Sequence, residues 1–342
     1  MNIASLPRVR LATLPTPLEP AERLSRTLGG PRILVKRDDM TGLALGGNKA
    51  RKLEFLLGAA QAAGATAVMT TAGAGSNYLR MTAAGARKVG MRPILFVRGT
   101  GQEPIQGNLL LNEIVGAEMR FIDVKDPWSP AAREMMEAAA RELEARGEKA
   151  YVITIQTTHA PLGAMGYVNA ALELYGQLVE LGAQATHLFV PAGSGVTQAG
   201  LILGAKLLNW PLRVVGVAGA PNSAEAHRGR IADIVERGAD LLGQRIKLSP
   251  DDVVVLDDYA GVSYGPPTAG ALRAMRLVGE EEGLILDPVY SGKNMHALMD
   301  WVDRGQLTAR DTVVFLHTGG APNLFAQAAT LGTALRETRL DR

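Results

Sequence analysis

The first feature of the sequence that could do chemistry is a lysine followed closely by two more cations. Lys49 comes directly after a Gly-Gly-Asn turn in the segment ALGGNKARKLEFL (44–56), where it opens an expected helix that also carries Arg51 and Lys52. The N-terminus of a helix is the positive end of its dipole and ordinarily favours acids. Cations there suggest that an anion binds beside them, although a solvated basic helix face would give the same pattern. Because neighbouring cations lower the pKa of a lysine, Lys49 is also a candidate Schiff-base nucleophile.

A glycine-rich loop is the second such feature. The sequence AGSGVTQAG (192–200) follows an apolar strand and opens a helix, and Gly193 and Gly195 would let a ligand approach the backbone. Ser194 and Thr197 add hydroxyls, and the free N–H groups of a helix start suit a phosphate. The glycine spacing is not that of a dinucleotide fingerprint, a P-loop or a nucleophile elbow. A phosphate site and an ordinary strand-to-helix turn both fit this loop.

A reactive lysine together with a phosphate site predicts pyridoxal 5′-phosphate as the cofactor. The chain has no cysteine, which excludes disulfides, thiolate nucleophiles and cysteine-ligated metal clusters. Its five histidines are isolated in the sequence and form no metal-binding pair, so we expect no metal site.

The charge and hydropathy of the chain indicate which classes of partner it binds and in which compartment it works. The formal net charge is +2 and the basic residues are interleaved with acids, so a nucleic-acid partner is not expected. The N-terminal segment lacks the apolar core of a secretory signal. The longest uncharged stretch, residues 150–172, is broken by polar residues and Pro161, so it would make a poor membrane span. We therefore expect a cytoplasmic enzyme that acts on a small molecule.

The elements that must position these residues follow an alternating pattern. Segments such as RILVKRD (32–38), PILFVRG (93–99) and DTVVFLHTGG (311–320) predict strands, and the longer segments between them predict helices. Strands that are apolar throughout and separated by helices form parallel sheets covered on both faces. The expected fold class is therefore α/β, with ligands bound beyond the carboxyl ends of the strands. A length of 342 residues favours two domains.

Eight short blocks of the sequence, in order along nearly the whole chain, resemble the ACC deaminase/D-cysteine desulfhydrase family of pyridoxal-phosphate enzymes. The blocks are LPTPLEP, KRDD, GGNKARKLEF, TTAGAGSNYLR, GSGVTQAGL, YGPP, LDPVYSGK and HTGGAPNLF. The resemblance implies fold type II, the tryptophan-synthase-β fold, with two doubly wound parallel-sheet domains and the cofactor in the cleft. It also implies a large domain of residues 1–53 and 160–342, a small domain of residues 54–159, and a homodimer.

The resemblance assigns catalytic roles to residues that match the family's motifs. Lys49 matches the lysine that binds the cofactor as a Schiff base. Ser76 matches the serine beside the substrate α-carbon, and Tyr264 and Tyr290 match two tyrosines that face the reacting substrate. Asn77 matches the asparagine that hydrogen-bonds the 3′-oxygen of the cofactor.

The same resemblance assigns the residues around the cofactor's phosphate and ring nitrogen. The matched phosphate-binding residues are Lys52 and the backbone of Gly193, Ser194, Gly195, Val196 and Thr197. Ser291 and Thr318 stand where ACC deaminases carry Glu and Leu, and both match the desulfhydrases. A carboxylate would keep the ring nitrogen protonated, as the opening of a cyclopropane requires. A neutral hydroxyl leaves a weaker electron sink, which suffices when a good leaving group departs from the β-carbon.

The sequence departs from the family pattern at three places near the expected substrate. These are AGAGSN (72–77), Tyr78, where His or Gln is usual, and QTTHAPLG (156–163). The changes leave the residues of the lyase chemistry in place and bear on the choice of substrate.

The expected activity is a β-elimination that converts D-cysteine to pyruvate, sulfide and ammonia, with Lys49 or Ser76 removing the α-proton. The alternatives are an L-cysteate sulfo-lyase, an ACC deaminase and a β-replacement synthase. A cofactor-binding protein without catalysis is a further alternative, which the presence of Lys49, Ser76 and both tyrosines disfavours.

Overall fold

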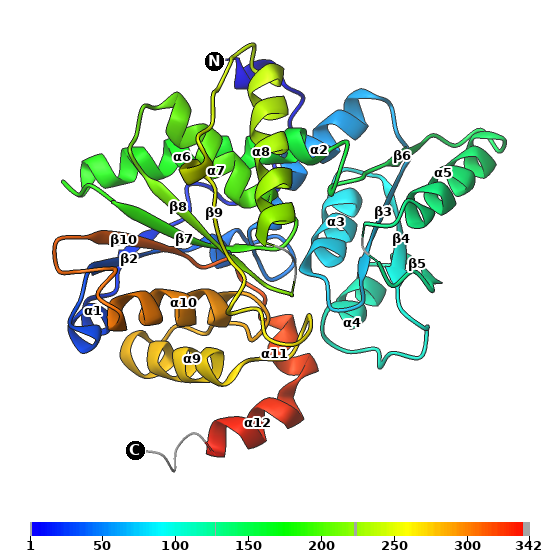
Figure 1. Cartoon of the computed structure of the whole chain (residues 1–342). Helices are drawn as coiled ribbons and strands as arrows, with labels where there is room; N and C mark the ends of the chain where they lie inside the picture. The colour runs from blue at the N-terminus through cyan, green and yellow to red at the C-terminus, as the bar shows by residue number, and fades with distance from the viewer. Residues whose placement is uncertain (1, 127, 222–223, 338–342) are drawn as a thin grey trace.

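The computed structural model describes residues 2–126, 128–221 and 224–337, which form two β-sheets (Figure 1). The larger sheet has six strands in the order β1-β2-β10-β7-β8-β9. Its neighbouring strands are parallel, except that β1 pairs antiparallel with β2. The strands are β1 (Leu18–Pro20), β2 (Arg32–Lys36), β7 (His187–Ala192), β8 (Arg213–Ala218), β9 (Val254–Leu256) and β10 (Thr312–Leu316).

The smaller sheet has four parallel strands in the order β5-β4-β3-β6 and lies beside the larger one (Figure 1). The strands are β3 (Ala67–Gly73), β4 (Arg92–Arg98), β5 (Glu118–Ile122) and β6 (Ala150–Val152). Strand β4 is apolar at consecutive positions because helices cover both of its faces. Leu95 and its neighbour Phe96 are accordingly both buried, although their side chains point to opposite faces.

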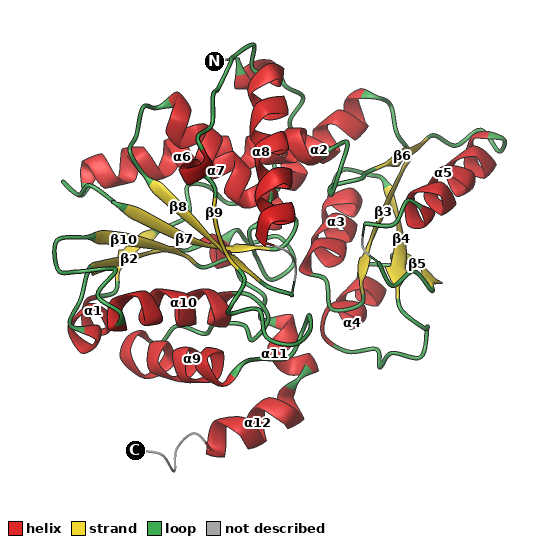
Figure 2. Ribbon diagram, in the orientation of Figure 1, coloured by secondary structure: helices red, strands yellow, loops and turns green. Residues whose placement is uncertain are grey.

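Helices cover both faces of the larger sheet (Figure 2). One face packs against α2 (Lys49–Ala62), α6 (Ala160–Glu180), α7 (Val196–Leu207) and α8 (Ala224–Leu241). The other packs against α1 (Glu22–Leu28), α9 (Ala269–Glu282) and α10 (Ser291–Asp303), with α12 (Ala328–Glu337) beside them. Successive residues of β2 therefore enter different cores: Leu34 joins the first core, and Ile33 and Val35 join the second.

The smaller sheet is covered in the same way. One face packs against α5 (Ala131–Glu144), and the other packs against α3 (Asn77–Lys88) and α4 (Gly107–Ile114). The short helix α11 (Pro322–Ala326) follows β10 and packs against α4. Three single turns of 3₁₀ helix complete the described elements, at Ile3–Ser5, Asp38–Met40 and Pro250–Asp252.

The structure confirms the predicted α/β class with parallel sheets. The helix expected after the Gly-Gly-Asn turn is α2, and the strand expected at 93–99 is β4. The four strands of the smaller sheet all fall inside the segment 54–159 that was predicted as the small domain. The boundary after residue 53 lies within α2 and stays a prediction.

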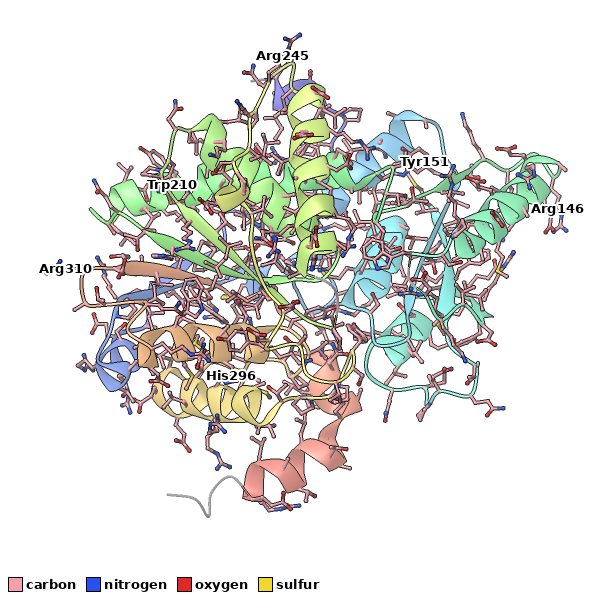
Figure 3. The ribbon with its side chains drawn as sticks, in the orientation of Figure 1. Arg146, Tyr151, Trp210, Arg245, His296 and Arg310 are labelled. Atoms are coloured by element: carbon pink, nitrogen blue, oxygen red, sulfur yellow. The ribbon has the colours of Figure 1, made fainter. Side chains whose placement is uncertain are left out.

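Two kinds of feature are absent from the described residues. No described helix is both long and apolar enough to cross a membrane. Likewise, no three His, Cys, Asp or Glu side chains among these residues are grouped so that they could hold a metal ion. His296 illustrates the isolated histidines, because it lies on α10 and packs edge-on against Tyr259 (Figure 3).

Candidate active site

A cavity of about 720 Å³ lies between the two sheets, at the carboxyl ends of β3, β4 and β7. This is where parallel α/β sheets bind ligands. The sequence-predicted residues that line it are Lys49, Lys52, Ser76, Asn77, Gly193, Ser194, Gly195, Thr197, Tyr264, Tyr290 and Thr318. Segments far apart in the sequence therefore meet at one cavity, while the roles assigned to their residues stay predictions.

Two predicted residues do not line the cavity. Val196 is fully buried in the core beside α8, and only its backbone, in the first turn of α7, belongs to the loop. The Ser291 hydroxyl donates to Oδ1 of Asp287 at 2.7 Å and accepts the backbone N–H of Asp287 at 2.7 Å. Asp287 therefore holds the Ser291 side chain beneath the cavity wall.

The turn before Lys49 requires glycine. Gly46 and Gly47 have φ angles of +70° and +131°, which L side chains rarely adopt. A Cβ on Gly46 would also collide with the backbone oxygen of Asp39. Helix α2 begins directly after this turn, and the Nζ of Lys49 donates to Oδ1 of Asn48 at 3.0 Å.

The surroundings of Lys49 make its amine reactive. Burial lowers the pKa of Lys49 from 10.5 to about 8; the charge of Asp287 opposes this shift and that of Arg80 adds to it. The neutral amine, which attacks a carbonyl, is therefore populated near neutral pH. The ring of Tyr290 lies 5.9 Å from the Nζ of Lys49.

Lys52 is a buried cation with no counter-ion in the part of the chain that the structure describes. Its side chain is 2% exposed and lines the cavity, and it makes no hydrogen bond or ion pair with any described residue. Burial, and then the charge of Lys49, lower its pKa well below the usual range. An unpaired buried ammonium is unfavourable, so an anion in the cavity would stabilise it.

The glycine-rich loop faces the same part of the cavity. Gly195 caps α7 with a φ of +84°, and a Cβ there would lie 2.7 Å from Cγ1 of Ile231. No side chain caps this helix start, so its first N–H groups remain free for a ligand. Asn48 ties the loop to the lysine turn, because its Nδ2 donates to Oγ1 of Thr197 at 3.1 Å.

Hydroxyl groups also line the cavity. Ser76 caps α3, and its Oγ accepts the N–H groups of Tyr78 and Leu79 at 3.1 and 3.4 Å. The hydroxyl of Tyr290 donates to that of Tyr264 at 3.1 Å. Burial, together with Tyr264, raises the pKa of Tyr290 well above its usual range, so both partners of this pair are neutral at physiological pH.

Comparison with known proteins identifies the family. Residues 9–319 match the family described as "Pyridoxal-phosphate dependent enzyme". A 1-aminocyclopropane-1-carboxylate deaminase of Methylobacterium sp. (strain 4-46) is 38% identical over 329 residues, which are 94% of this chain and 97% of that protein. The chain belongs to the ACC deaminase family of pyridoxal-phosphate-dependent enzymes.

Solved structures agree with this assignment. The crystal structure of an ACC deaminase homologue superimposes with a TM-score of 0.88 at 38% identity, covering 97% of this chain and 98% of that chain. The processed form of threonine deaminase isoform 2 from Solanum lycopersicum has a TM-score of 0.66 at 18% identity, with coverage of 97% and 91%. The second likeness extends to the fold alone, which is that of the type II enzymes.

The cofactor of this family is pyridoxal 5′-phosphate, and the cavity fits it. The unpaired ammonium of Lys52 and the uncapped start of α7 suit a phosphate dianion. Lys49 lies one helical turn before Lys52, so its amine projects into the same cavity. These two observations of the structure point to the same group as the sequence does.

Arg51 corrects one interpretation of the sequence. We interpreted Arg51 as a cation that attracts the anion and lowers the pKa of Lys49, but it is 1% exposed and lies away from the cavity. The reason is helical spacing. Residues three apart, such as Lys49 and Lys52, share a face, whereas residues two apart lie on opposite faces.

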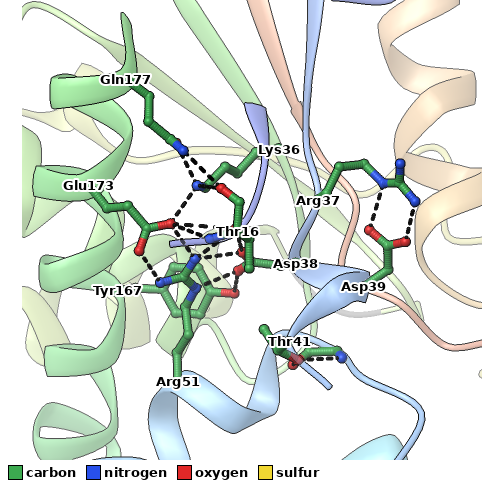
Figure 4. A network of polar contacts seen from close by, with 11 residues as sticks. Thr16, Lys36, Arg37, Asp38, Asp39, Thr41, Arg51, Tyr167, Glu173 and Gln177 are labelled. Atoms are coloured by element: carbon green, nitrogen blue, oxygen red, sulfur yellow. Dashed lines mark hydrogen bonds and ion pairs between the residues drawn. The ribbon is translucent and has the colours of Figure 1, made fainter. Parts of the chain in front are cut away.

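Arg51 instead belongs to a buried ionic network (Figure 4). Its Nε and Nη2 each donate to a carboxylate oxygen of Asp38 at 2.9 Å, and its Nη1 and Nη2 donate to Glu173 at 2.9 and 2.8 Å. Tyr167 donates to Asp38 at 2.5 Å, and Lys36 donates to Glu173 at 2.5 Å. Burial opposes ionisation of Asp38, but the charge of Arg51 outweighs it and holds the pKa of Asp38 below its usual value. The network therefore fixes α2 against β2 and α6.

Asp287 is a structural residue of the site that sequence reasoning missed. Its carboxylate accepts the N–H groups of Val289, Tyr290 and Ser291 at 3.0, 3.1 and 2.7 Å. It thereby shapes the turn from which Tyr290 enters the cavity. The available signal is the Asp-Pro pair in LDPVY, since Asp before Pro favours a turn in which the carboxylate binds the following N–H groups.

The lowered pKa of Lys49 predicts how cofactor loading depends on pH. Below about 8 the amine is mostly protonated, so the rate at which apoprotein binds the cofactor covalently should rise with pH and level off above that value. The rate is measured from the visible absorbance that develops after cofactor is added to apoprotein. N-acetyl-lysine is the control, and its rate should continue to rise towards the usual lysine pKa. A protein profile identical to that control would contradict this account of Lys49.

Proposed function

We propose that the protein is a lyase that removes a leaving group from the β-carbon of a small amino acid, with D-cysteine converted to pyruvate, sulfide and ammonia. The observation that carries this proposal is the neutral side chain of Thr318 beside the Gly-Gly-Asn turn that precedes Lys49. Thr318 lines the cavity, and its backbone oxygen accepts the N–H of Asn48 at 3.1 Å. The carboxylates of Asp123 and Asp126 line the cavity beyond β5 of the smaller sheet, and that of Asp287 is turned towards residues 289–291.

A neutral hydroxyl at this place favours β-elimination over cyclopropane opening. When bound, pyridoxal 5′-phosphate supplies the electron sink that acidifies the α-proton of the substrate. A hydroxyl such as that of Thr318 shares a hydrogen bond without fixing a proton on the ring, so the sink is weaker. A weaker sink suffices when the β-substituent is itself a good leaving group.

The residues around the substrate have separable tasks. Lys49 holds the cofactor and, once displaced as a neutral amine, accepts the α-proton. The Oγ of Ser76 already accepts two N–H groups, so its own hydrogen is free to donate towards the cavity, which suits orientation of the substrate. The Tyr264–Tyr290 pair is neutral and can donate a proton or a hydrogen bond to the leaving group. The N–H of Asn77, the first residue of α3, is not one of the two that Ser76 caps, and it is left to receive the substrate carboxylate.

ACC deamination is the second candidate, because the relatives that are 37–38% identical over nearly the full length carry that name. Ser291 and Thr318, in place of the Glu and Leu expected for that reaction, disfavour it. An L-cysteate sulfo-lyase and a β-replacement synthase use the same lysine chemistry. The homodimer also stays a proposal.

The test incubates the pure protein separately with D-cysteine, L-cysteine, L-cysteate and ACC. Pyruvate with sulfide from D-cysteine alone is the expected result. Pyruvate with sulfite from L-cysteate would keep the mechanism and change the substrate. 2-Oxobutanoate from ACC would replace the proposal by a deaminase, and absence of keto acid until a second nucleophile is added would replace it by a synthase.

A further inference from the structure

Arg98 is an arginine of the cavity wall that finds no partner among the residues the structure describes. It is the last residue of β4, so it lies at the carboxyl end of the smaller sheet and lines the cavity. Its Nε is buried without a hydrogen-bond partner, and its guanidinium makes no hydrogen bond or ion pair with any other residue in the described ranges. An arginine keeps its charge, and a partly buried guanidinium with free N–H groups is stabilised by an anion that accepts them.

The neighbours of Arg98 indicate where its anion would lie. Burial lowers the pKa of Arg98, and the groups whose charges act against this shift are Tyr264, Asp126 and Tyr290. Arg98 therefore lies close to the tyrosine pair. Asp126 is exposed at the rim, and its Oδ1 accepts the N–H of Trp128 at 2.9 Å.

The cofactor and the substrate carboxylate do not account for Arg98. The phosphate has Lys52 and the start of α7, and the carboxylate has the uncapped N–H of Asn77 at the start of α3. Neither group uses Arg98, which lines the same cavity as the two tyrosines proposed to face the leaving group. Lys125 also lines the rim, but it is exposed to solvent, which would screen its charge.

We propose that Arg98 is the specificity-determining residue for the β-substituent of the substrate, and that it binds a substituent carrying negative charge. A thiolate and a sulfonate are two sulfur groups of this kind. The inference rests on the proposed β-elimination. For a sulfonate the balance is cysteate plus water giving pyruvate, ammonium and hydrogen sulfite. The α-proton goes to the base, the carbon–sulfur bond breaks with its electron pair leaving on sulfite, and Arg98 stabilises that charge.

The first experiment measures binding without turnover. The probe is 3-sulfopropanoate, which has the carboxylate and sulfonate of cysteate but no amine, titrated calorimetrically into the holoenzyme. Arg98→Gln should weaken its binding about 10- to 100-fold, because a hydrogen-bonded charge pair is lost. Butanoate, which has no second charge, should bind wild type and variant alike. Unchanged binding of 3-sulfopropanoate in Arg98→Gln would overturn the proposal.

Strand β4 supplies its own matched control. Arg92, at the opposite end of the strand, pairs with Glu148 at 2.9 Å outside the cavity, so Arg92→Gln should leave the binding of the probe unchanged. Arg98→Lys keeps the charge and should retain more of the affinity than Arg98→Gln. An equal loss in all three variants would mean that the strand, and not the charge, is responsible, which also overturns the proposal.

Turnover then distinguishes the two anions. With Arg98→Gln, kcat/KM should fall selectively for L-cysteate if the group is a sulfonate, and for D-cysteine if it is a thiolate, relative to β-chloroalanine in both cases. The same fall for all three substrates contradicts the proposal. If none is turned over while the probe still requires Arg98, the proposed function fails and the anion site stands. If the substrates are turned over but the binding of 3-sulfopropanoate does not depend on Arg98, the proposed function stands and the proposal for Arg98 fails.

Discussion

Replacing Lys49 by alanine is expected to abolish both turnover and covalent attachment of the cofactor. Lys49 is the lysine on the wall of the cavity whose pKa is lowered to about 8, and it follows a turn that only glycine can form. Loss of a nucleophile that is also the proposed base should reduce kcat by at least about 10³-fold. The substitution leaves the phosphate site intact, so the variant should still bind the cofactor non-covalently.

Attachment is measured by mass spectrometry after borohydride reduction, and turnover by keto-acid release. Wild type should gain the mass of one cofactor per chain, and Lys49→Ala should gain none. Lys125→Ala is the control, because Lys125 is an exposed lysine on the rim of the same cavity. Retained turnover in Lys49→Ala would show that Lys49 is not needed for the reaction. Attachment of the cofactor at another lysine in wild type would show that Lys49 is not the lysine that binds it.

Replacing Arg51 by alanine is expected to destabilise the protein by about 3–5 kcal/mol, because it leaves buried carboxylates without their partner. Arg51 is 1% exposed, and it pairs with both Asp38 and Glu173. The large effect comes from the charge of Asp38, which is itself fully buried and cannot be solvated where it lies.

The measurement is urea unfolding, with stability extrapolated to water. Arg133→Ala is the control, because Arg133 forms an exposed pair with Glu137 on α5, and loss of such a pair costs about 0.2–1 kcal/mol. If the two variants lost equal stability, Arg51 would not have the structural role assigned to it. Cofactor affinity of folded Arg51→Ala should stay near that of wild type, which separates this residue from Lys52.

The three cations that follow the Gly-Gly-Asn turn illustrate what a sequence predicts. The sequence predicted Lys49 as a candidate nucleophile, the turn before it and the helix after it, because each of these depends on neighbouring residues. The different direction of Arg51 followed from helical geometry, but its partners Asp38 and Glu173 come from β2's end and from α6. Such partners depend on tertiary contacts that local patterns do not contain.

Arg98 and Arg92 make the same limit plain. Arg92 is the first residue of strand β4 and Arg98 is the last. Nothing in the segment PILFVRG or its surroundings indicates which of the two arginines forms an ion pair. The sheet directions decide it, since the carboxyl end of β4 meets the cavity and the other end meets Glu148. Likewise, alternating strands predict parallel sheets, but the position of the final strand β10 between β2 and β7 does not follow from its sequence.

The cavity wall is built by residues from both sheets, which has a consequence for the evolution of the family. The reactive lysine and the phosphate loop belong to helices on the larger sheet, whereas Arg98 ends strand β4 of the smaller sheet, and Lys125 and Trp128 follow its strand β5. The lysine and the phosphate site are thus encoded in a different stretch of the gene from Arg98, the residue proposed to select the β-substituent. If that proposal holds, mutations at Arg98 change which amino acid is accepted while the lysine and the phosphate site stay in place. A family with this architecture can acquire new substrates through drift in one stretch, without rebuilding its catalyst.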